Sequence, residues 1–189
     1  PFVTASNPIS GGACTGLGIG PKKITRVIGV AKAYTTRVGM GPFPTEINDE
    51  INQTLRTAGN EFGATTGRPR RCGWFDAIIV RYATVLNGID ELIITKLDVL
   101  SGLKTIKIGV KYIYNDQSVD IYPLDTEIFE NVDVEYEEMQ GWDTNINNIS
   151  TYKDLPTAAK KYIDRIEELV GTKITAVSVG SAREQIIAR

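Results

Sequence analysis

Histidine is absent from the 189-residue chain, and cysteine occurs only twice, at Cys14 and Cys72. Without histidine, the chain cannot build a Ser-His-Asp or Cys-His nucleophile, and it offers no Cys/His set for a structural zinc ion. Two cysteines are too few for a disulfide scaffold, so we interpret them as free thiols in a reducing, cytoplasmic setting. Any chemistry in this chain must rest on arginine, lysine, carboxylates, hydroxyls and backbone amides, and we expect no metal site in it.

An excess of basic residues and long apolar runs are also missing. The formal net charge is −2 and the sequence pI is about 5.3, which argues against a nucleic-acid partner. No apolar run approaches the ~20 residues of a membrane-spanning helix, and the first residues lack the pattern of a signal peptide. We therefore expect a cytoplasmic protein without a membrane segment. Because the chain does not begin with Met, we expect a fragment of a longer protein.

Helical and extended patterns alternate along the chain. Apolar residues recur at helical spacing in four segments, and two short apolar runs bounded by turn residues indicate strands. The predicted helices cover 24–34, 48–58, 75–86 and 156–170, and the predicted strands cover 91–95 and 174–179. Alternation of apolar residues with lysines from Thr105, with a turn at Asn115-Asp116, predicts antiparallel strands. The prediction is an α/β fold, part of a mostly parallel sheet with flanking helices, plus a small antiparallel β insertion at about 104–140.

The first candidate site is the arginine-rich loop Gly63-Ala-Thr-Thr-Gly-Arg-Pro-Arg-Arg71. Three arginines within four residues repel one another unless an anion lies between them. Guanidinium groups bind carboxylates and phosphates in a bidentate manner, and threonine hydroxyls and loop amides add neutral donors. The residue types alone leave two interpretations open, an anion-binding loop and a solvated basic surface loop.

The second candidate site is Thr95-Lys-Leu-Asp98, which follows a predicted apolar strand. Ligands in open α/β sheets bind at the carboxyl ends of the strands. An aspartate can accept hydrogen bonds from guanine N1–H and from the exocyclic amine, and the lysine stem can lie along the base. The pattern is similar to the Asn-Lys-x-Asp motif of GTPases, with Thr95 in the place of Asn. A helix N-cap at Asp98 is the competing interpretation.

Small residues at Ser178-Val-Gly180 follow the last predicted strand and would let a planar ligand approach the backbone, although a plain strand exit fits equally. The glycine-rich stretch from Gly11 to Gly20 lacks both the Gly-Lys-Ser/Thr ending of a phosphate loop and the Gly-x-Gly-x-x-Gly spacing. Phosphate binding by such a loop is therefore not expected from this chain.

Taken in order, these segments resemble the adenylosuccinate synthetase family, specifically its C-terminal half. The resemblance extends over nearly the whole chain. It is carried by Pro1-Phe-Val-Thr-Ala-Ser-Asn7, Lys32-Ala-Tyr-Thr-Thr-Arg-Val-Gly39, Gly41-Pro-Phe-Pro-Thr-Glu46, Gly59-Asn-Glu-Phe-Gly-Ala-Thr-Thr-Gly-Arg-Pro-Arg-Arg71, Gly73-Trp-Phe-Asp76, Thr95-Lys-Leu-Asp-Val-Leu-Ser-Gly-Leu103 and Tyr162-Ile-Asp-Arg-Ile-Glu-Glu-Leu-Val-Gly171.

The resemblance implies a GTP-dependent ligase of purine biosynthesis. Such an enzyme joins IMP and L-aspartate to make adenylosuccinate and releases GDP and phosphate. GTP first phosphorylates the 6-oxygen of IMP, and the aspartate amine then displaces the phosphate from C6. The resemblance also implies a homodimer and a Mg²⁺ cofactor.

The resemblance assigns three sets of binding residues to this chain. The set for IMP is Thr4, Val38 and Arg68. The set for aspartate is the loop Gly63, Ala64, Thr65, Thr66, Gly67, Arg68 and Arg70. The set for GTP is Arg70, Lys96, Leu97, Asp98, Ser178, Val179 and Gly180.

Two departures from the family pattern stand out. Where the family usually has Gly-Pro shortly after the serine that corresponds to Ser178, this chain has Gly180-Ser181. The loss of the proline implies a less constrained loop end. The catalytic aspartate and histidine, the phosphate loop and the Mg²⁺ ligands of the family belong to its N-terminal half. We therefore expect no catalytic residue in this chain, and we expect the chain alone to be inactive.

Two alternatives to a ligase are a GTP-binding regulatory module and a non-enzymatic domain whose basic loop binds RNA. The arginine loop argues against the first, because a simple guanine module does not need a second site shaped for carboxylates. The −2 net charge and the lack of RNA-stacking aromatic motifs argue against the second.

Overall fold

The computed structural model describes residues 8–119, 122 and 125–189. Its central sheet has four strands in the order β1-β5-β9-β10. Strands β1, β5 and β9 are parallel, and β10 is antiparallel to β9. Because the three parallel strands share one direction, their carboxyl ends lie at the same edge of the sheet. The strands cover Ile28–Lys32 (β1), Glu91–Thr95 (β5), Ile174–Ser178 (β9) and Ile186–Ala188 (β10).

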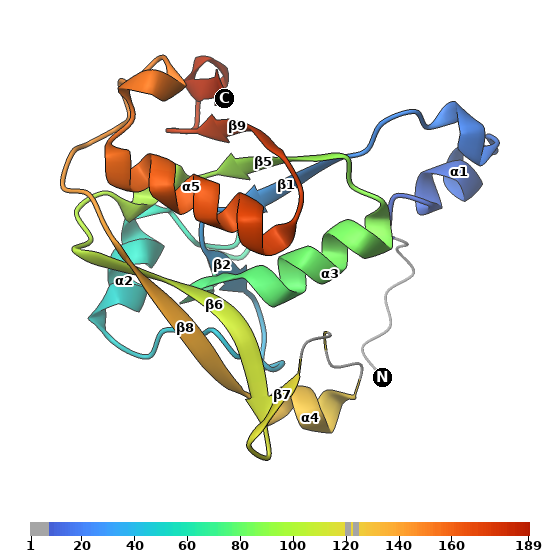
Figure 1. The fold of residues 1–189 in the computed structure, drawn as a ribbon, viewed down its shortest axis with the longest axis horizontal. Coiled ribbons are helices and arrows are strands. Elements are labelled where there is room, and N and C mark those ends of the chain that lie inside the picture. The colour runs from blue at the N-terminus through green and yellow to red at the C-terminus, as the bar shows by residue number, and fades with distance from the viewer. Residues whose placement is uncertain (1–7, 120–121, 123–124) are drawn as a thin grey trace.

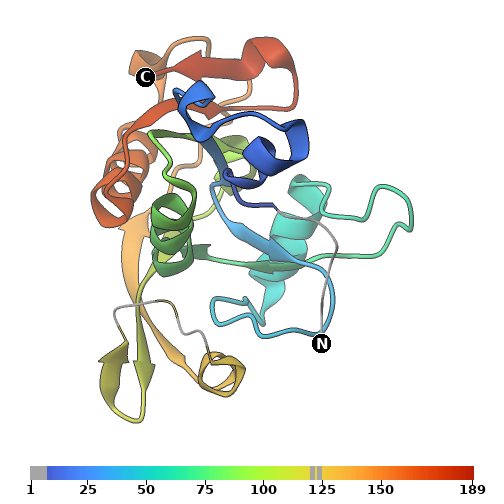
Figure 2. The same ribbon diagram turned by 90° about the vertical axis from the view of Figure 1, so that its right-hand side faces the viewer.

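Helices α3 (Ala77–Asn87) and α5 (Thr157–Val170) lie together over one face of this sheet (Figures 1 and 2). Helix α3 begins where Asp76 Oδ1 accepts a hydrogen bond from the Ile79 amide at 3.1 Å. Glycines in the left-handed conformation end both helices, Gly88 at φ 58° and Gly171 at φ 72°. Both helices were expected from the sequence, and α5 matches its predicted bounds closely.

A second sheet contains β4 (Phe75–Asp76), β6 (Thr105–Tyr114), β7 (Gln117–Val119) and β8 (Asp133–Gln140). Strand β6 pairs antiparallel with β7 and β8, and it pairs parallel with β4. The predicted fold class, parallel strands with flanking helices and an antiparallel sheet, is confirmed. Whether residues 1–189 form part of one domain stays a prediction.

The remaining elements are short. They are α1 (Gly12–Leu17), α2 (Glu50–Ala58), α4 (Thr126–Glu130), β2 (Thr35–Arg37), β3 (Arg71–Gly73), η1 (Pro21–Lys23), η2 (Leu97–Leu100), η3 (Tyr152–Asp154) and η4 (Arg183–Gln185). Helix α2 was predicted, and the Asp49 side chain caps it by accepting from the Ile51 amide at 2.8 Å. Strands β2 and β3 form a separate antiparallel pair.

The helix predicted over 24–34 is wrong, because the chain forms the strand β1 there, at Ile28–Lys32. Exposure alternates along β1, with Gly29 buried between exposed Ile28 and Val30, as in a strand. The β-branched residues favour an extended backbone, and pairing with β5 supplies the hydrogen-bonded ladder. Apolar spacing alone could not reveal that β5 would be the partner.

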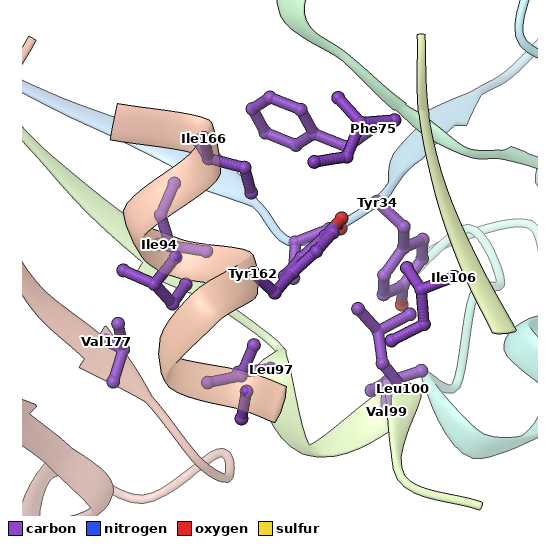
Figure 3. Packing of buried hydrophobic residues seen from close by; sticks show 14 of the residues in the cluster. Tyr34, Phe75, Ile94, Leu97, Val99, Leu100, Ile106, Tyr162, Ile166 and Val177 are labelled. Carbon is purple, nitrogen blue, oxygen red and sulfur yellow. Dashed lines mark hydrogen bonds between the residues drawn. The ribbon is translucent and has the colours of Figure 1, made fainter. Parts of the chain in front are cut away.

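The hydrophobic core lies between α5, the central sheet and β6 (Figure 3). Tyr162 of α5 is fully buried in it, and its hydroxyl donates to the Ala33 carbonyl at 2.7 Å. This contact ties α5 to the residue that follows β1. Among the described residues, no helix has the length and apolar character needed to cross a membrane.

Replacing Tyr162 with phenylalanine should lower the free energy of unfolding by about 1–2 kcal/mol, because a buried carbonyl loses its donor. Denaturant unfolding of the purified protein measures the change. Tyr114→Phe is the matched control, since it removes a hydroxyl from a half-buried ring at the end of β6. An equal effect of the two variants would contradict the role given to the Tyr162 hydroxyl.

Candidate functional site

The arginine loop connects α2 to β3 and extends away from the sheet (Figure 2). Two hydrogen bonds close it, from the Gly63 amide to the Arg68 carbonyl and from the Gly67 amide to the Gly63 carbonyl, each at 2.8 Å. Gly67 has φ 63°, a conformation that glycine adopts without strain. Ala64, Thr65, Thr66 and Arg68 are exposed within this closed loop. The loop therefore presents hydroxyls and a guanidinium group to the solvent in a defined shape.

Glu61, at the base of the loop, is the central charge of the site. Its side chain is 0% exposed and accepts from cations that belong to three separate segments. Lys32 Nζ lies 2.8 Å and Lys96 Nζ lies 3.0 Å from Oε1, and Arg70 Nη1 lies 2.7 Å from Oε2. The Tyr34 hydroxyl also donates to Oε1, at 2.6 Å. Four donors thus converge on one buried carboxylate.

The charges in this cluster are unbalanced, since three cations surround one anion. Burial alone would raise the pKa of Glu61, but the hydrogen bonds from Lys32, Tyr34, Lys96 and Arg70 outweigh it and lower the pKa to about 2. Burial also lowers the pKa of Lys32, although Glu61 acts in the opposite direction. Glu61 is therefore ionised at neutral pH, and the surrounding positive charge favours an anionic ligand.

The segment after β5 begins with an unusual backbone conformation. Lys96 has φ 60°, which costs a residue with a side chain about 1–3 kcal/mol. Its amide donates to Ser178 Oγ at 3.0 Å, and its ammonium group contacts Glu61 and the Gly59 carbonyl. Because β5 and β9 are parallel neighbours, the ends that carry Lys96 and Ser178 meet. The lysine stem is held with its charged end fixed.

Asp98 lies in η2, just beyond Lys96. Its Oδ1 atom is buried and receives no hydrogen bond from any residue the structure describes. Burial raises the pKa of Asp98, while its own amide, Lys96 and Asn147 act to lower it. A buried acceptor without a donor is costly in a protein interior. This atom is accordingly the strongest local indication of a ligand with N–H donors.

The other residues predicted to bind GTP are largely occupied by packing or by hydrogen bonds within the protein. Leu97 and Val179 are fully buried in the hydrophobic core, so their side chains serve packing. A Cβ on Gly180 would lie 2.2 Å from Gln185 Oε1, so the Gln185 side chain packs closely over this glycine and would have to move for a larger residue. Ser178 is 5% exposed and is occupied with Lys96.

Val38 follows β2 and is half exposed. Arg71 holds the next residues by donating to the carbonyls of Gly39 at 2.9 Å and Gly41 at 2.8 Å. Arg71 also forms a two-pronged ion pair with Glu46. The third arginine of the loop therefore supports the Val38 segment and is not available to a ligand.

The structure brings the arginine loop, the Lys96–Asp98 segment and Ser178 together, and the β2–β3 pair connects the Val38 segment to the end of the loop. Thr4 lies outside the described residues. Sequence reasoning missed Glu61, Lys32 and Tyr34. The signal that could have found Glu61 is the need of clustered arginines for a nearby counter-charge.

Comparison with known proteins identifies the family. The family model for adenylosuccinate synthetase matches residues 1–187. The chain belongs to the adenylosuccinate synthetase family. The synthetase of Bifidobacterium longum (strain NCC 2705) is 53% identical over 187 residues, which are 99% of this chain and 44% of that protein. The synthetase of Desulfitobacterium hafniense (strain DSM 10664 / DCB-2) is 52% identical over 189 residues, again 44% of its length.

A solved synthetase has the same architecture. The fully ligated adenylosuccinate synthetase of Plasmodium falciparum superposes with a TM-score of 0.96 and 43% sequence identity, covering 100% of this chain and 46% of that one. The chain thus spans a little under half the length of the synthetases it matches.

Magnesium, which the family implies, does not fit the part of the chain that the structure describes. No group of three or more Cys, Asp or Glu side chains within residues 8–119, 122 and 125–189 could hold a metal ion.

Proposed function

We propose that the intact protein ligates IMP and L-aspartate to adenylosuccinate at the expense of GTP, releasing GDP and phosphate. In this proposal the present chain supplies binding elements for all three substrates, and the catalytic groups, the phosphate loop and the Mg²⁺ ligands lie in the part of the protein outside this chain. A cytoplasmic homodimer is the proposed working form.

One observation carries the proposal. Two elements that a three-substrate ligase needs, a carboxylate-binding loop and a guanine-binding segment, meet on one buried carboxylate, Glu61. Joining aspartate to a purine activated by GTP requires several anionic groups to be held in one place, with their charge neutralised as the phosphoryl group moves. The net positive cluster around Glu61 suits that demand.

The residues divide between the substrates in the proposal. Thr65, Thr66, Arg68 and Arg70 hold the carboxylates of aspartate, and Arg68 also contacts IMP. Asp98 accepts from guanine N1–H and the exocyclic amine, while the anchored Lys96 stem lies along the base. Backbone atoms of Leu97 and Val179, with Ser178 and Gly180, complete the guanine contacts, and Val38 and Thr4 contact IMP. Residues Gly63, Ala64 and Gly67 shape the loop.

Product analysis tests the function. The intact protein, given IMP, aspartate, GTP and magnesium, should form adenylosuccinate and GDP in equal amounts, and omission of any one substrate should stop both. Residues 1–189 alone should form neither. A GTP-binding regulatory module would bind GTP without consuming aspartate, so saturable GTP binding with no product would favour that alternative. Adenylosuccinate formation by residues 1–189 alone would contradict the division between the two parts.

A further inference from the structure

Glu61 has no acceptor capacity left for a ligand. A carboxylate offers about four lone-pair directions. The donors from Lys32, Tyr34, Arg70 and Lys96 make five contacts of 2.6–3.0 Å with its two oxygens. The side chain is also 0% exposed. Whatever Glu61 contributes to substrate binding must therefore pass through the residues it holds.

Two of these residues belong to different substrate-binding elements. Arg70 ends the arginine loop, and its amide also donates to the Glu61 carbonyl at 2.9 Å, so backbone and side chain of Glu61 both hold it. Lys96 begins the guanine segment in a strained conformation with φ 60°. Such strain persists only where the surroundings fix the residue. The contacts with Glu61, the Gly59 carbonyl and Ser178 provide that fixation.

We propose that Glu61 is a positioning residue that holds Arg70 and Lys96 together, so that the aspartate and guanine ends of the site are ordered by one group. The inference rests on the proposed function for its kinetic test. Glu61 itself contacts no substrate. Lys32 and Tyr34 fill its remaining acceptor directions and keep the carboxylate in one orientation.

A positioning role and a purely electrostatic role predict changes of opposite sign in the KM values for aspartate and GTP when the charge of Glu61 is removed. If Glu61 only reduced the positive charge, removing its charge would leave three uncompensated cations and strengthen the binding of anionic substrates. If Glu61 positions Arg70 and Lys96, removing its charge releases both side chains and weakens the binding of both aspartate and GTP. The sign of the change in KM therefore distinguishes the two roles.

The experiment uses Glu61→Gln in the intact protein. We expect the KM for aspartate and the KM for GTP to rise together by about tenfold, within the range usual for coupled sites. Glu137→Gln is the matched control, because it breaks a two-pronged pair with Arg165 on the surface of β8. That variant should leave both KM values unchanged.

Several outcomes would overturn the proposal. A lowered melting temperature with unchanged KM values would make Glu61 merely structural, and lower KM values would make it electrostatic. A rise in only one of the two KM values would show that Glu61 does not order the aspartate and guanine ends of the site together. If Glu61→Gln does not fold, Glu61→Asp keeps the charge but shortens the reach, and unchanged KM values for that variant would also contradict positioning.

Amide hydrogen exchange gives a readout that needs no activity. In the intact Glu61→Gln protein, the hydrogen-bonded amides of Gly63, Gly67 and Arg70 in the loop and those of Lys96 and Val99 in the guanine segment should both exchange faster, while the amides of α5 keep their wild-type rates. If the wild-type protein forms no adenylosuccinate, the proposed function fails, yet this exchange pattern still decides whether Glu61 holds the two segments. Unchanged exchange in either segment contradicts the proposal.

Discussion

Replacing Arg68 with leucine in the intact protein is expected to lower kcat/KM for aspartate about a hundredfold, because the carboxylate of the substrate loses its charged partner. Arg68 is exposed, and the ion pairs found among the described residues do not include it, unlike those of Arg70 and Arg71. Its guanidinium is therefore free for a ligand. The KM for IMP should rise too, whereas the KM for GTP should stay within about twofold, since the guanine segment is held by Glu61 and Ser178.

Stability separates this effect from misfolding. An exposed side chain without a structural ion pair contributes within about 0.5 kcal/mol to the free energy of unfolding. The Arg68→Leu protein should therefore keep its melting temperature. Arg165→Leu, which removes a guanidinium group of α5 that pairs with Glu137 of β8, is the control for general charge effects and should not change aspartate kinetics. Equal loss of GTP and aspartate affinity in Arg68→Leu would show that the proposed division of roles is wrong.

The fold class and the three longest helices, α2, α3 and α5, could be predicted because the local signals were strong. Helix α5 has an apolar stripe, Pro156 before its first residue and Gly171 after its last. The helix prediction for residues 24–34 was wrong because their apolar residues fit both the helical and the strand periodicity. The partner strand β5 lies about sixty residues away in the sequence. Tertiary pairing decided the outcome, and a local pattern does not contain it.

The site was predictable in its exposed parts and not in its buried ones. The arginine loop and the Lys96–Asp98 segment stand out by composition. Glu61 is a single acidic residue between Asn60 and Phe62, and although the nearby arginines require a counter-charge, the sequence does not show that Lys32 and Lys96 also contact it. Those partners come from the end of β1, the end of the loop and the end of β5. Only the fold brings them together, so the link between the arginine loop and the Lys96–Asp98 segment could not be predicted from the sequence.

Asp98→Asn is expected to raise the KM for GTP about a hundredfold in the intact protein, while the KM for aspartate changes little. The amide keeps the shape of the side chain but has one acceptor instead of two, and its NH₂ group opposes a guanine donor. Loss of hydrogen bonds to a charged group costs about 1.5–3 kcal/mol each, and 1.4 kcal/mol corresponds to a factor of ten. Steady-state kinetics with GTP as the varied substrate measures the effect.

Inosine triphosphate provides the matched comparison, because it lacks the exocyclic amine of guanine. The wild-type protein should prefer GTP over inosine triphosphate, and this preference should shrink in Asp98→Asn.

The stability of the Asp98→Asn protein should change in the opposite direction from its affinity for GTP. Burial raises the pKa of Asp98, so folding disfavours its charged form at neutral pH, and a neutral amide removes that cost. A small rise in melting temperature together with a large loss of GTP affinity would show that the buried Oδ1 atom is kept for the ligand at the expense of stability. An unchanged preference for GTP in the variant would place guanine recognition elsewhere.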